Sequence, residues 1–577
     1  MEMKKYSNNK NVLMLLSLMK QHNIRKVIAS PGTTNIAVVG SMQHDDYFEM
    51  YSAVDERSAA YMACGLAAES GEPVAIICTG ATASRNYFPA LTEAYYRKLP
   101  ILVIAGSHGE ENIGHLHSQV IDRTQAPKDT VVYSSFINPI TSKNTEWYNR
   151  VEINKSMIKL CQHGGGPVLI NLFASAKETF GTDELPQTRA IKLCSYVDDL
   201  PAMSNGRIAI FIGAHAQMSQ SFQETIDSFC ASRDAVVFCD HTSGYQGKYQ
   251  VNFTLVNGQI NATSDLLNVD LLIHIGEVSG DTYTTGRLNP KEVWRVSPDG
   301  EVRDLFKKLV RVFEMDEQYF FTQYTTESQG DDLYLQACNN LYEEALEKLL
   351  EFGLGNLYVA KKIASRLPAG CVIHFGIYNS LRTWNMFRLD PSIHASCNVG
   401  GFGIDGACST LIGASLADTN RLHFLCVGDL AFFYDLNAIG NRHVGNNVRI
   451  ILINNGRGVE FRKKDHPGYR FGMEADLYMA AAGHYGCQSK DLVKHYATDL
   501  GFEYLTASTK EELDEVVERF LVPSLTEKPM LLEVFPDYED DVANLDSLRH
   551  SMPDNRKLSK KLEDTAKCLA KKVLNRK

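Results

Sequence analysis

Short apolar runs alternate along this chain with longer segments in which apolar and polar residues are mixed. Two of these runs, residues 423–427 and 448–453, contain few polar side chains and are followed by glycine or asparagine. Such runs are typical of parallel strands, which are covered on both faces and therefore need apolar side chains on both. The mixed segment between them, residues 431–443, is predicted to be a helix. This pattern predicts an α/β protein.

The same alternation divides the chain into three doubly wound parallel-sheet domains. Strands predicted at 207–213 and 269–276 belong to the second domain, and a polar helical stretch at 327–350 leads into the third. A chain of 577 residues is too long for one ordinary domain and fits three of roughly 150 to 200 residues each. The predicted domains are residues 1–188, 189–345 and 346–577.

Composition narrows the class of protein. Apolar residues make up 44% of the chain and charged residues 22%, as in soluble globular proteins. The net charge of -11 argues against a nucleic-acid-binding surface. Residues 556–577 nevertheless form a basic tail, predicted to be a solvated terminal helix or, alternatively, a site for an anionic partner.

Neither a membrane span nor a secretory leader is predicted. The apolar run at 12–19 is too short to cross a bilayer and lacks a small-residue cleavage site, so a core helix is expected there. The 13 cysteines are scattered without a Cys-x-x-Cys pair. This arrangement is typical of free thiols in a reducing compartment and predicts a cytoplasmic protein.

Asp429 and Asn455 are the strongest candidates for chemistry. Asp429 follows Gly428 after the first apolar run, and Asn455 follows the second. The carboxyl ends of neighbouring parallel strands meet at one edge of an open sheet, where ligands bind. A carboxylate, an amide oxygen and a backbone carbonyl such as that of Arg457 suit Mg²⁺, which takes its remaining oxygens from phosphate and water. The spacing therefore predicts a magnesium and diphosphate site.

This pattern resembles the diphosphate-binding motif of thiamine diphosphate (ThDP) enzymes. Further segments resemble the pyrimidine-binding domain of the acetolactate synthase and pyruvate decarboxylase superfamily, namely residues 30–35, 54–60, 78–80 and 86–90. The SEPHCHC synthase branch, from the menaquinone pathway, is the most similar, because it also shows the patterns at 403–406 and 435–437.

The resemblance implies both an architecture and a set of cofactors. The three domains would be a pyrimidine (PYR) domain, a central domain and a diphosphate (PP) domain, and the cofactors would be ThDP and Mg²⁺. A homodimer or homotetramer with active sites at the subunit interface is implied. No nucleic acid or membrane partner is expected.

Glu56 and Ile404 are the residues that the resemblance assigns to cofactor activation. In the family the carboxyl group matching Glu56 hydrogen-bonds N1′ of the aminopyrimidine, and the residue matching Ile404 is an apolar wedge that bends the cofactor. The alternatives are a favourable charge in the first turn of a helix and an ordinary core isoleucine. The full set of predicted cofactor-binding residues is Glu56, Pro31, Thr79, Asn86, Gly403, Ile404, Gly428, Asp429, Leu430, Ala431 and Asn455.

The substrate end departs from the SEPHCHC synthase pattern. That branch grips its acidic substrates with arginines, and the matching positions here are Thr34, Val399 and Trp384, with Arg382 close to the last. Guanidinium groups pair with carboxylates through two hydrogen bonds, so their loss predicts a less anionic substrate. Ser380 and Phe461 complete the predicted substrate residues.

Gln119, His115 and His117 are predicted to act on the reacting carbon. Gln119 matches a family glutamine, and the two histidines resemble the pair in pyruvate decarboxylase-like members. Imidazole titrates near neutrality and suits proton transfer, although solvated loop histidines are the alternative. His374 and Tyr378 are further candidates for the cleft.

The predicted function is ThDP- and Mg²⁺-dependent decarboxylation of a 2-oxo acid, with carboligation to an acceptor carbonyl of an aldehyde or ketone. One alternative is a simple 2-oxo acid decarboxylase that releases an aldehyde. A second is a catalytically inactive scaffold subunit with the ThDP-enzyme fold. Binding of FAD by the central domain is disfavoured because that domain lacks a dedicated glycine fingerprint.

Overall fold

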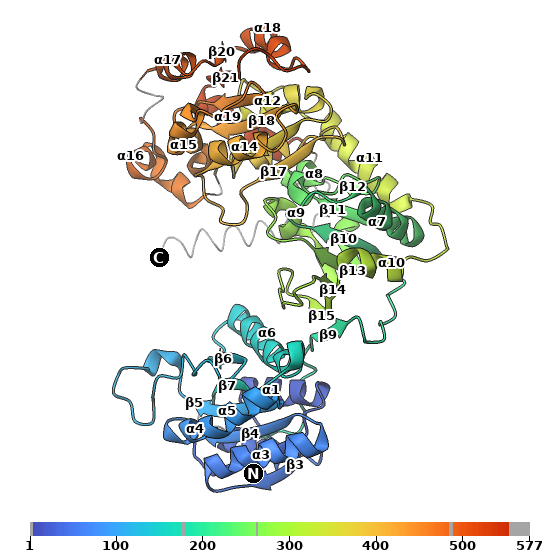
Figure 1. The fold of residues 1–577 in the computed structure, drawn as a ribbon, viewed down its shortest axis with the longest axis vertical. Helices are drawn as coiled ribbons and strands as arrows, with labels where there is room; N and C mark the ends of the chain where they lie inside the picture. The colour runs from blue at the N-terminus through green and yellow to red at the C-terminus, as the bar shows by residue number, and fades with distance from the viewer. Residues whose placement is uncertain (1–3, 175–178, 261–263, 465, 484–488, 553–577) are drawn as a thin grey trace. The chain divides into compact units, whose positions relative to one another are not determined.

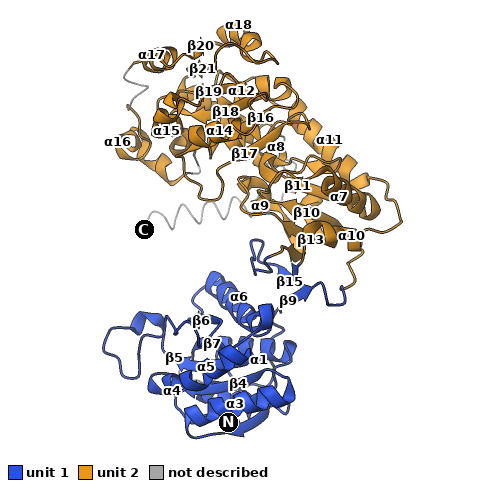
Figure 2. Ribbon diagram, in the orientation of Figure 1, with its two compact units in different colours: residues 1–200, 299–314 blue, residues 201–298, 315–577 orange. Residues whose placement is uncertain are grey.

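The computed structural model describes residues 4–174, 179–260, 264–464, 466–483 and 489–552 (Figure 1). It forms two compact units, residues 1–200 with 299–314, and residues 201–298 with 315–577 (Figure 2). The basic tail predicted at 556–577 lies outside the described residues. Among the described residues, no helix is both long enough and apolar enough to cross a membrane.

The first unit is built on a six-stranded parallel sheet with the order β3-β2-β4-β5-β7-β6. Its strands are β2 (Lys26–Ala29), β3 (Glu49–Ser52), β4 (Val74–Thr79), β5 (Ile101–Ser107), β6 (Tyr133–Ile137) and β7 (Val168–Phe173). Its helices are α1 (Lys10–Gln21), α2 (Ile36–Met42), α3 (Glu56–Ser70), α4 (Thr82–Asn86), α5 (Phe88–Arg97) and α6 (Lys143–Lys159). The short strands β1 (Tyr6–Ser7) and β8 (Phe180–Thr182) pair antiparallel, and β9 (Lys192–Ser195) pairs with β15 (Leu309–Glu314) in parallel.

The apolar sequence of strand β4 follows from the burial of both faces of its sheet. Ala75 and Ile77 belong to the core that contains residues of α1 and α6, whereas Ile76 and Cys78 belong to the core that contains residues of α3 and α5. Successive side chains of a strand point to opposite faces, so a sheet covered on both faces needs apolar residues at every position. The apolar run at 12–19 lies in α1 and is buried, as predicted for a core helix.

The second unit contains another six-stranded parallel sheet, with the order β17-β16-β18-β19-β21-β20. Its strands are β16 (Val372–Phe375), β17 (His394–Cys397), β18 (His423–Gly428), β19 (Val448–Ile453), β20 (Glu503–Ala507) and β21 (Met530–Val534). Counted along the chain within each sheet, both six-stranded sheets have the order 2-1-3-4-6-5. The helices around this sheet are α12 (Asn356–Ile363), α13 (Asn379–Trp384), α14 (Ala407–Ser415), α15 (Asp429–Tyr434), α16 (Ala475–Tyr478), α17 (Leu492–Asp499), α18 (Lys510–Phe520) and α19 (Tyr538–Arg549).

The second unit also carries parallel strands in the order β12-β11-β10-β13-β14. They are β10 (Ile208–Ile212), β11 (Val236–Cys239), β12 (Gln250–Val251), β13 (Asn268–Ile275) and β14 (Asn289–Val296). The accompanying helices are α7 (Gln220–Arg233), α8 (Thr254–Gly258), α9 (Thr282–Arg287), α10 (Glu317–Tyr324) and α11 (Leu333–Glu347). The α/β prediction is confirmed, and the three domain boundaries stay a prediction.

The helix predicted at 431–443 is wrong in extent. Helix α15 ends at Tyr434 and is followed by a 3-10 helix at Leu436–Gly440. Asp435 between them accepts hydrogen bonds from the backbone N–H and the hydroxyl of Ser409, at 2.6 and 2.7 Å. These bonds hold Asp435 at φ -121°, outside the helical region, so α15 stops there.

Candidate active site

The Gly-Asp and Asn-Asn motifs meet at the carboxyl edge of the β16–β21 sheet. Strand β18 ends at Gly428, and Asp429 begins α15, while Asn455 comes two residues after the end of β19. These strands are neighbours in the sheet, which places the two motifs side by side. The local order of strand, glycine and helix therefore positions the site, as the spacing predicted.

Asp429 is a buried carboxylate, with only 5% of its surface exposed. One oxygen accepts the N–H of Leu430 at 2.8 Å, and the other accepts the N–H of Gly456 at 2.7 Å. Burial raises the pKa of Asp429 to about 7, and the nearby charge of Asp541 acts in the same direction. Because the two hydrogen bonds do not offset the loss of hydration, a cation at this place would relieve the carboxylate.

Asp541 of α19 is a site residue that the sequence did not predict. Its Oδ2 accepts a hydrogen bond from Nδ2 of Asn455 at 3.0 Å, and its Oδ1 accepts the N–H of Asn356 at 2.8 Å. Burial raises the pKa of Asp541 to about 6. The bond to Asn455 fixes which end of that amide is the donor, so the amide oxygen is left for other partners. That oxygen accepts the N–H of Arg457 at 3.3 Å, a long hydrogen bond.

The donor set fits a small hard cation. Asp429 offers a carboxylate oxygen, Asn455 an amide oxygen, and Arg457 its backbone carbonyl. The guanidinium of Arg457 is engaged elsewhere, since it pairs with Asp476 at 2.8 Å and lies 3.6 Å from the ring centre of Tyr538. The described residues contain no group of three His, Cys, Asp or Glu side chains that could hold a metal by themselves. A cation here would therefore need oxygen ligands from a bound phosphate or from water.

A cavity of about 370 Å³ opens beside this donor set. Ile404 lines it together with Tyr378, Ser380 and Phe461, so the predicted wedge and two predicted substrate residues reach the same space. Trp384 is fully buried against Phe375. The cavity is lined by Asn356, Gly376, Ile377, Tyr378, Asn379, Ser380, Ile404, Gly428, Asp429, Leu430, Ala431, Ile453, Asn455, Arg457, Gly458, Val459, Glu460, Phe461, His466 and Asp541.

Three predicted or candidate residues lie away from this lining. Val399 is 4% exposed and Trp384 is fully buried, and neither is among the described lining residues. His374 is 3% exposed and its Nδ1 lies 2.9 Å from the hydroxyl of Ser396. Burial lowers the pKa of His374 to about 4, so a neutral ring within the sheet is expected.

Glu460 and His466 line the cavity although the sequence did not single them out. Nη1 of Arg382 lies 2.8 and 2.9 Å from the two carboxylate oxygens of Glu460, and Nζ of Lys463 lies 2.7 Å from one of them. Burial opposes the ionisation of Glu460, but Lys463 and Arg382 hold its pKa below the ordinary value. His466 accepts the N–H of Gly468 through Nδ1 at 3.0 Å, which leaves Nε2 as the protonated nitrogen of the neutral ring.

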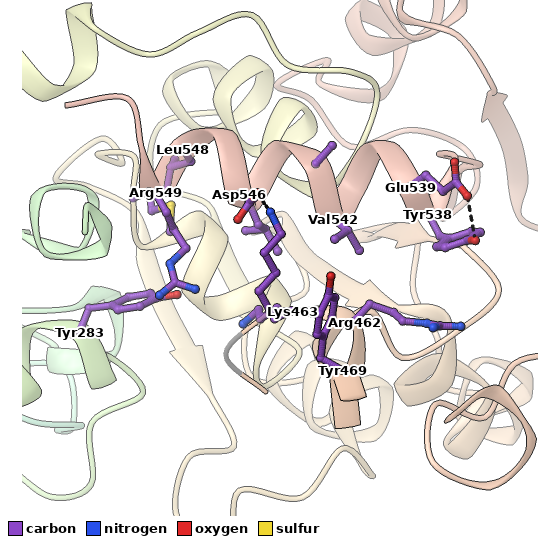
Figure 3. A pocket seen from close by; sticks show the side chains of 14 residues that line it. Tyr283, Arg462, Lys463, Tyr469, Tyr538, Glu539, Val542, Asp546, Leu548 and Arg549 are labelled. Atoms are coloured by element: carbon purple, nitrogen blue, oxygen red, sulfur yellow. Dashed lines mark hydrogen bonds and ion pairs between the residues drawn. The ribbon is translucent and has the colours of Figure 1, made fainter. Parts of the chain in front are cut away.

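A second cavity, of about 360 Å³, lies next to α19 (Figure 3). Val542 and Asp546 of that helix face Arg462, Lys463 and Tyr469 across it. Residues 459–464 therefore form a wall between two cavities. Glu460 and Phe461 line the cavity beside Asp429, whereas Arg462 and Lys463 line the second.

In the first unit, Glu56 begins α3 and is half-buried. Burial raises the pKa of the Cys78 thiol to about 12, and the Glu56 charge adds to that rise. The hydroxyls of Thr34 and Thr79 hydrogen-bond each other, and Thr34 also donates to the carbonyl of Gly106 at 3.2 Å. Pro31 lines a hollow at the ends of β2 and β3. Their binding roles stay predictions.

His115, His117 and Gln119 are exposed in the segment between β5 and β6. Leu116 between the histidines is fully exposed and has a φ of 60°, and Gln119 has a φ of 62°. Left-handed backbone is uncommon for such residues and marks the segment as a functional candidate. Asn86 is exposed at the end of α4. The catalytic roles of the histidines and Gln119 stay predictions.

Comparisons with known proteins found similarity to thiamine pyrophosphate enzymes. The model of the N-terminal TPP binding domain of thiamine pyrophosphate enzymes matches residues 12–126. A protein of Bacteroides fragilis, named 2-succinyl-5-enolpyruvyl-6-hydroxy-3-cyclohexene-1-carboxylate synthase, is 29% identical over 566 residues, which cover 95% of this chain and 100% of the relative. A protein of the same name from Bacteroides thetaiotaomicron is 29% identical, over 95% of this chain and 99% of the relative. Another from Flavobacterium johnsoniae is 26% identical, over 92% of this chain and 96% of the relative.

Proposed function

Because this chain is a ThDP-dependent enzyme close to the menaquinone-pathway branch of its superfamily, we propose that it decarboxylates a 2-oxo acid and joins the product to an acceptor carbonyl. The observation that carries the proposal is the meeting of Asp429, Asn455 and Ile404 around one cavity at a sheet edge. Bound ThDP supplies the carbon centre that makes loss of CO₂ from a 2-oxo acid possible.

The PP domain holds the charged end of the cofactor. Asp429, the amide oxygen of Asn455 and the carbonyl of Arg457 would hold Mg²⁺, which would supply positive charge for an anionic diphosphate group. Leu430 and Ala431 lie in the first turn of α15, which has Gly428 as its N-cap, and the N-terminus of a helix favours an anion. Ile404, which lines the cavity, would support the bound cofactor as an apolar wedge.

The PYR domain supplies the proton chemistry. Glu56 holds a proton at N1′ of the aminopyrimidine, and its place at the first turn of α3, half-buried, suits a carboxyl group that shares a proton. Gln119 orients the substrate carbonyl, and His115 or His117 donates a proton to the product. We propose a homodimer or homotetramer in which the PYR domain of one subunit and the PP domain of another share the cofactor.

One calorimetric experiment tests the proposal. ThDP is titrated into the metal-free protein with and without Mg²⁺, and 2-oxo acids are screened for CO₂ release with wild type and Glu56→Gln. Mg²⁺-dependent binding, with CO₂ release that the substitution abolishes, is the expected result. Absence of binding would refute the proposal, and binding without turnover of any 2-oxo acid would favour a scaffold subunit.

Product analysis separates the two enzymatic alternatives. A carboligase consumes an aldehyde or ketone acceptor in proportion to the CO₂ released, whereas a simple decarboxylase releases one aldehyde for each CO₂ and leaves the acceptor unchanged.

All eleven described cysteines are free thiols, which supports the further proposal of a cytoplasmic enzyme.

A further inference from the structure

Helix α19 contacts two of the three residues that are predicted to hold the cation. Asp541 of this helix accepts a hydrogen bond from Nδ2 of Asn455 at 3.0 Å. About one helical turn earlier, the ring centre of Tyr538 lies 3.6 Å from Cζ of Arg457. Asn455 would give its amide oxygen to the cation, and Arg457 its backbone carbonyl. One helix thus holds two predicted ligands, although neither ligand belongs to it.

Asp541 determines which atom of the Asn455 amide remains available to a cation. Only 2% of Asp541 is exposed, and its other carboxylate oxygen accepts the N–H of Asn356 at 2.8 Å. An ionised carboxylate accepts hydrogen bonds and donates none, so the amide nitrogen of Asn455 must face it. The amide oxygen is then left for the N–H of Arg457, in a long bond of 3.3 Å, and for a cation. Half a turn of the amide would bring its NH₂ group to the cation and remove that ligand.

The guanidinium of Arg457 is held from two directions. Asp476 pairs with it at 2.8 Å, and the face of the Tyr538 ring lies against it. A guanidinium that is fixed by an acid and by an aromatic face leaves the side chain little freedom. The backbone of the same residue, which carries the predicted carbonyl ligand, is restricted with it.

The helix has a firm attachment of its own, next to the start of α12. Nδ2 of Asn544 donates to the carbonyl of Gly353, and Oδ1 of Asn544 accepts the N–H of the same glycine, both at 2.9 Å. A Cβ on Gly355 would lie 2.5 Å from Oδ1 of Asp541 and 2.9 Å from Nδ2 of Asn544, so the backbone approaches the helix closely there. These contacts give α19 a fixed place from which it can hold the two ligands.

We propose that α19 positions the cation ligands, with Asp541 orienting the amide of Asn455 and Tyr538 restraining Arg457. This inference rests on the proposed function. Asp541 and Tyr538 are positioning residues, because they act through the ligands that they hold and do not bind the cation themselves. Binding of Mg²⁺ with ThDP is therefore linked to the docking of α19, and each stabilises the other.

Calorimetric titration of Mg²⁺ into the metal-free protein, in the presence of ThDP, tests the role of Asp541. Asp541→Asn should weaken Mg²⁺ binding by about 10- to 100-fold, the usual effect of losing a partner that orients a metal ligand. Asp540→Asn removes the neighbouring acid at an exposed position of the same helical turn. It is the matched control, and its affinity should change by less than about twofold, because exposed charges are screened. Unchanged binding by Asp541→Asn, or an equal loss in both variants, would overturn the inference.

Two substitutions of Tyr538 test the hold on Arg457. Tyr538→Leu removes the ring and should weaken Mg²⁺ binding by at least about threefold, whereas Tyr538→Phe keeps the aromatic face and should bind Mg²⁺ as wild type does. The hydroxyl lost in Tyr538→Phe donates to Glu539 at 3.0 Å, and Glu539 is not a predicted ligand (Figure 3). Equal affinities of the two variants would refute the role of the ring.

Hydrogen exchange of the wild-type protein gives a readout that requires neither turnover nor a substitution. Saturating Mg²⁺ and ThDP should slow amide exchange in α19 by at least about tenfold, because a ligand that binds only the docked state stabilises that state. Unchanged exchange in α19, with binding still seen in the calorimeter, would overturn the inference and leave the proposed function intact. Failure of wild type to bind ThDP and Mg²⁺ would overturn both, and the two failures are thereby distinguished.

Discussion

Replacing Asp429 by asparagine should make the metal-free protein more stable at alkaline pH while abolishing its cofactor binding. The reason is the raised pKa of the buried carboxyl group, about 7 against an ordinary value of 3.8. The folded protein therefore holds a proton on Asp429 that the unfolded chain gives up at lower pH. A folded state that binds more protons than the unfolded state loses stability as pH rises.

The magnitude follows from the shift. A rise from 3.8 to about 7 corresponds to a penalty of about 4 kcal/mol once the group is ionised in both states. The loss begins near pH 4, where the unfolded chain ionises, and is complete above pH 7. Roughly 2 to 3 kcal/mol of it falls between pH 5 and pH 8. The stability of Asp429→Asn does not depend on pH in this way, because asparagine does not ionise. Its Nδ2 would, however, face the N–H of Gly456 and leave that donor unpaired, which costs about 1 to 3 kcal/mol of stability.

Differential scanning calorimetry of the metal-free proteins measures the effect. Relative to Asp429→Asn, wild type should lose roughly 2 to 4 °C in melting temperature between pH 5 and pH 8. Mg²⁺ with ThDP at about 100 times the dissociation constant should then raise the free energy of unfolding of wild type by about 2.7 kcal/mol and leave that of the variant unchanged. Asp418→Asn, at an exposed position after α14, is the control for replacing a carboxylate by an amide. A gap between wild type and Asp429→Asn that is equal at both pH values would refute the reasoning.

Four further outcomes are expected. Removal of Mg²⁺ with EDTA should weaken ThDP binding by at least about tenfold in calorimetry, and added Mg²⁺ should restore it; unchanged affinity would exclude the cation site. Ile404→Ala should lower kcat for CO₂ release by about 10- to 100-fold because the bent cofactor loses its support, while Ile404→Leu should retain most of the rate. Gly80→Ala should destabilise the protein by about 1 to 3 kcal/mol, since its Cβ would lie 2.3 Å from Nη1 of Arg123 and 2.8 Å from the carbonyl oxygen of Gly106. Gly65→Ala, in open space on α3, should instead stabilise it by about 0.5 to 1 kcal/mol in the same thermal unfolding assay.

Local patterns allowed the meeting of Asp429 and Asn455 at one sheet edge to be predicted, while the binding of a cation there stays a prediction. Asp429 comes directly after an apolar strand and Asn455 two residues after the next, so the strands carry both to the sheet edge, and the family resemblance is confirmed. The extent of the helix after Asp429 was mispredicted because a hydrogen bond from Ser409, on another helix, ends it at Asp435. The roles of Glu56 and of the histidines beside Gln119 remain predictions.

Other site residues could not be found from spacing. Asp541 reaches Asn455 across 86 residues, and Arg382 reaches Glu460 across 78. Such contacts depend on how separate helices pack onto the sheet, and no fixed interval in the sequence signals them. For Asp541 the local sequence shows only an acidic residue on a buried helix face. This pattern does not predict which residue the acid contacts.

The strand order shared by the two six-stranded sheets gives the positions of one sheet equivalents in the other. The third strand of one sheet ends at Thr79 and that of the other at Gly428, so the two positions correspond. Equivalent edges of the two sheets therefore carry different side chains. One carries the acid and amide suited to a cation, and the other carries the paired hydroxyls of Thr34 and Thr79.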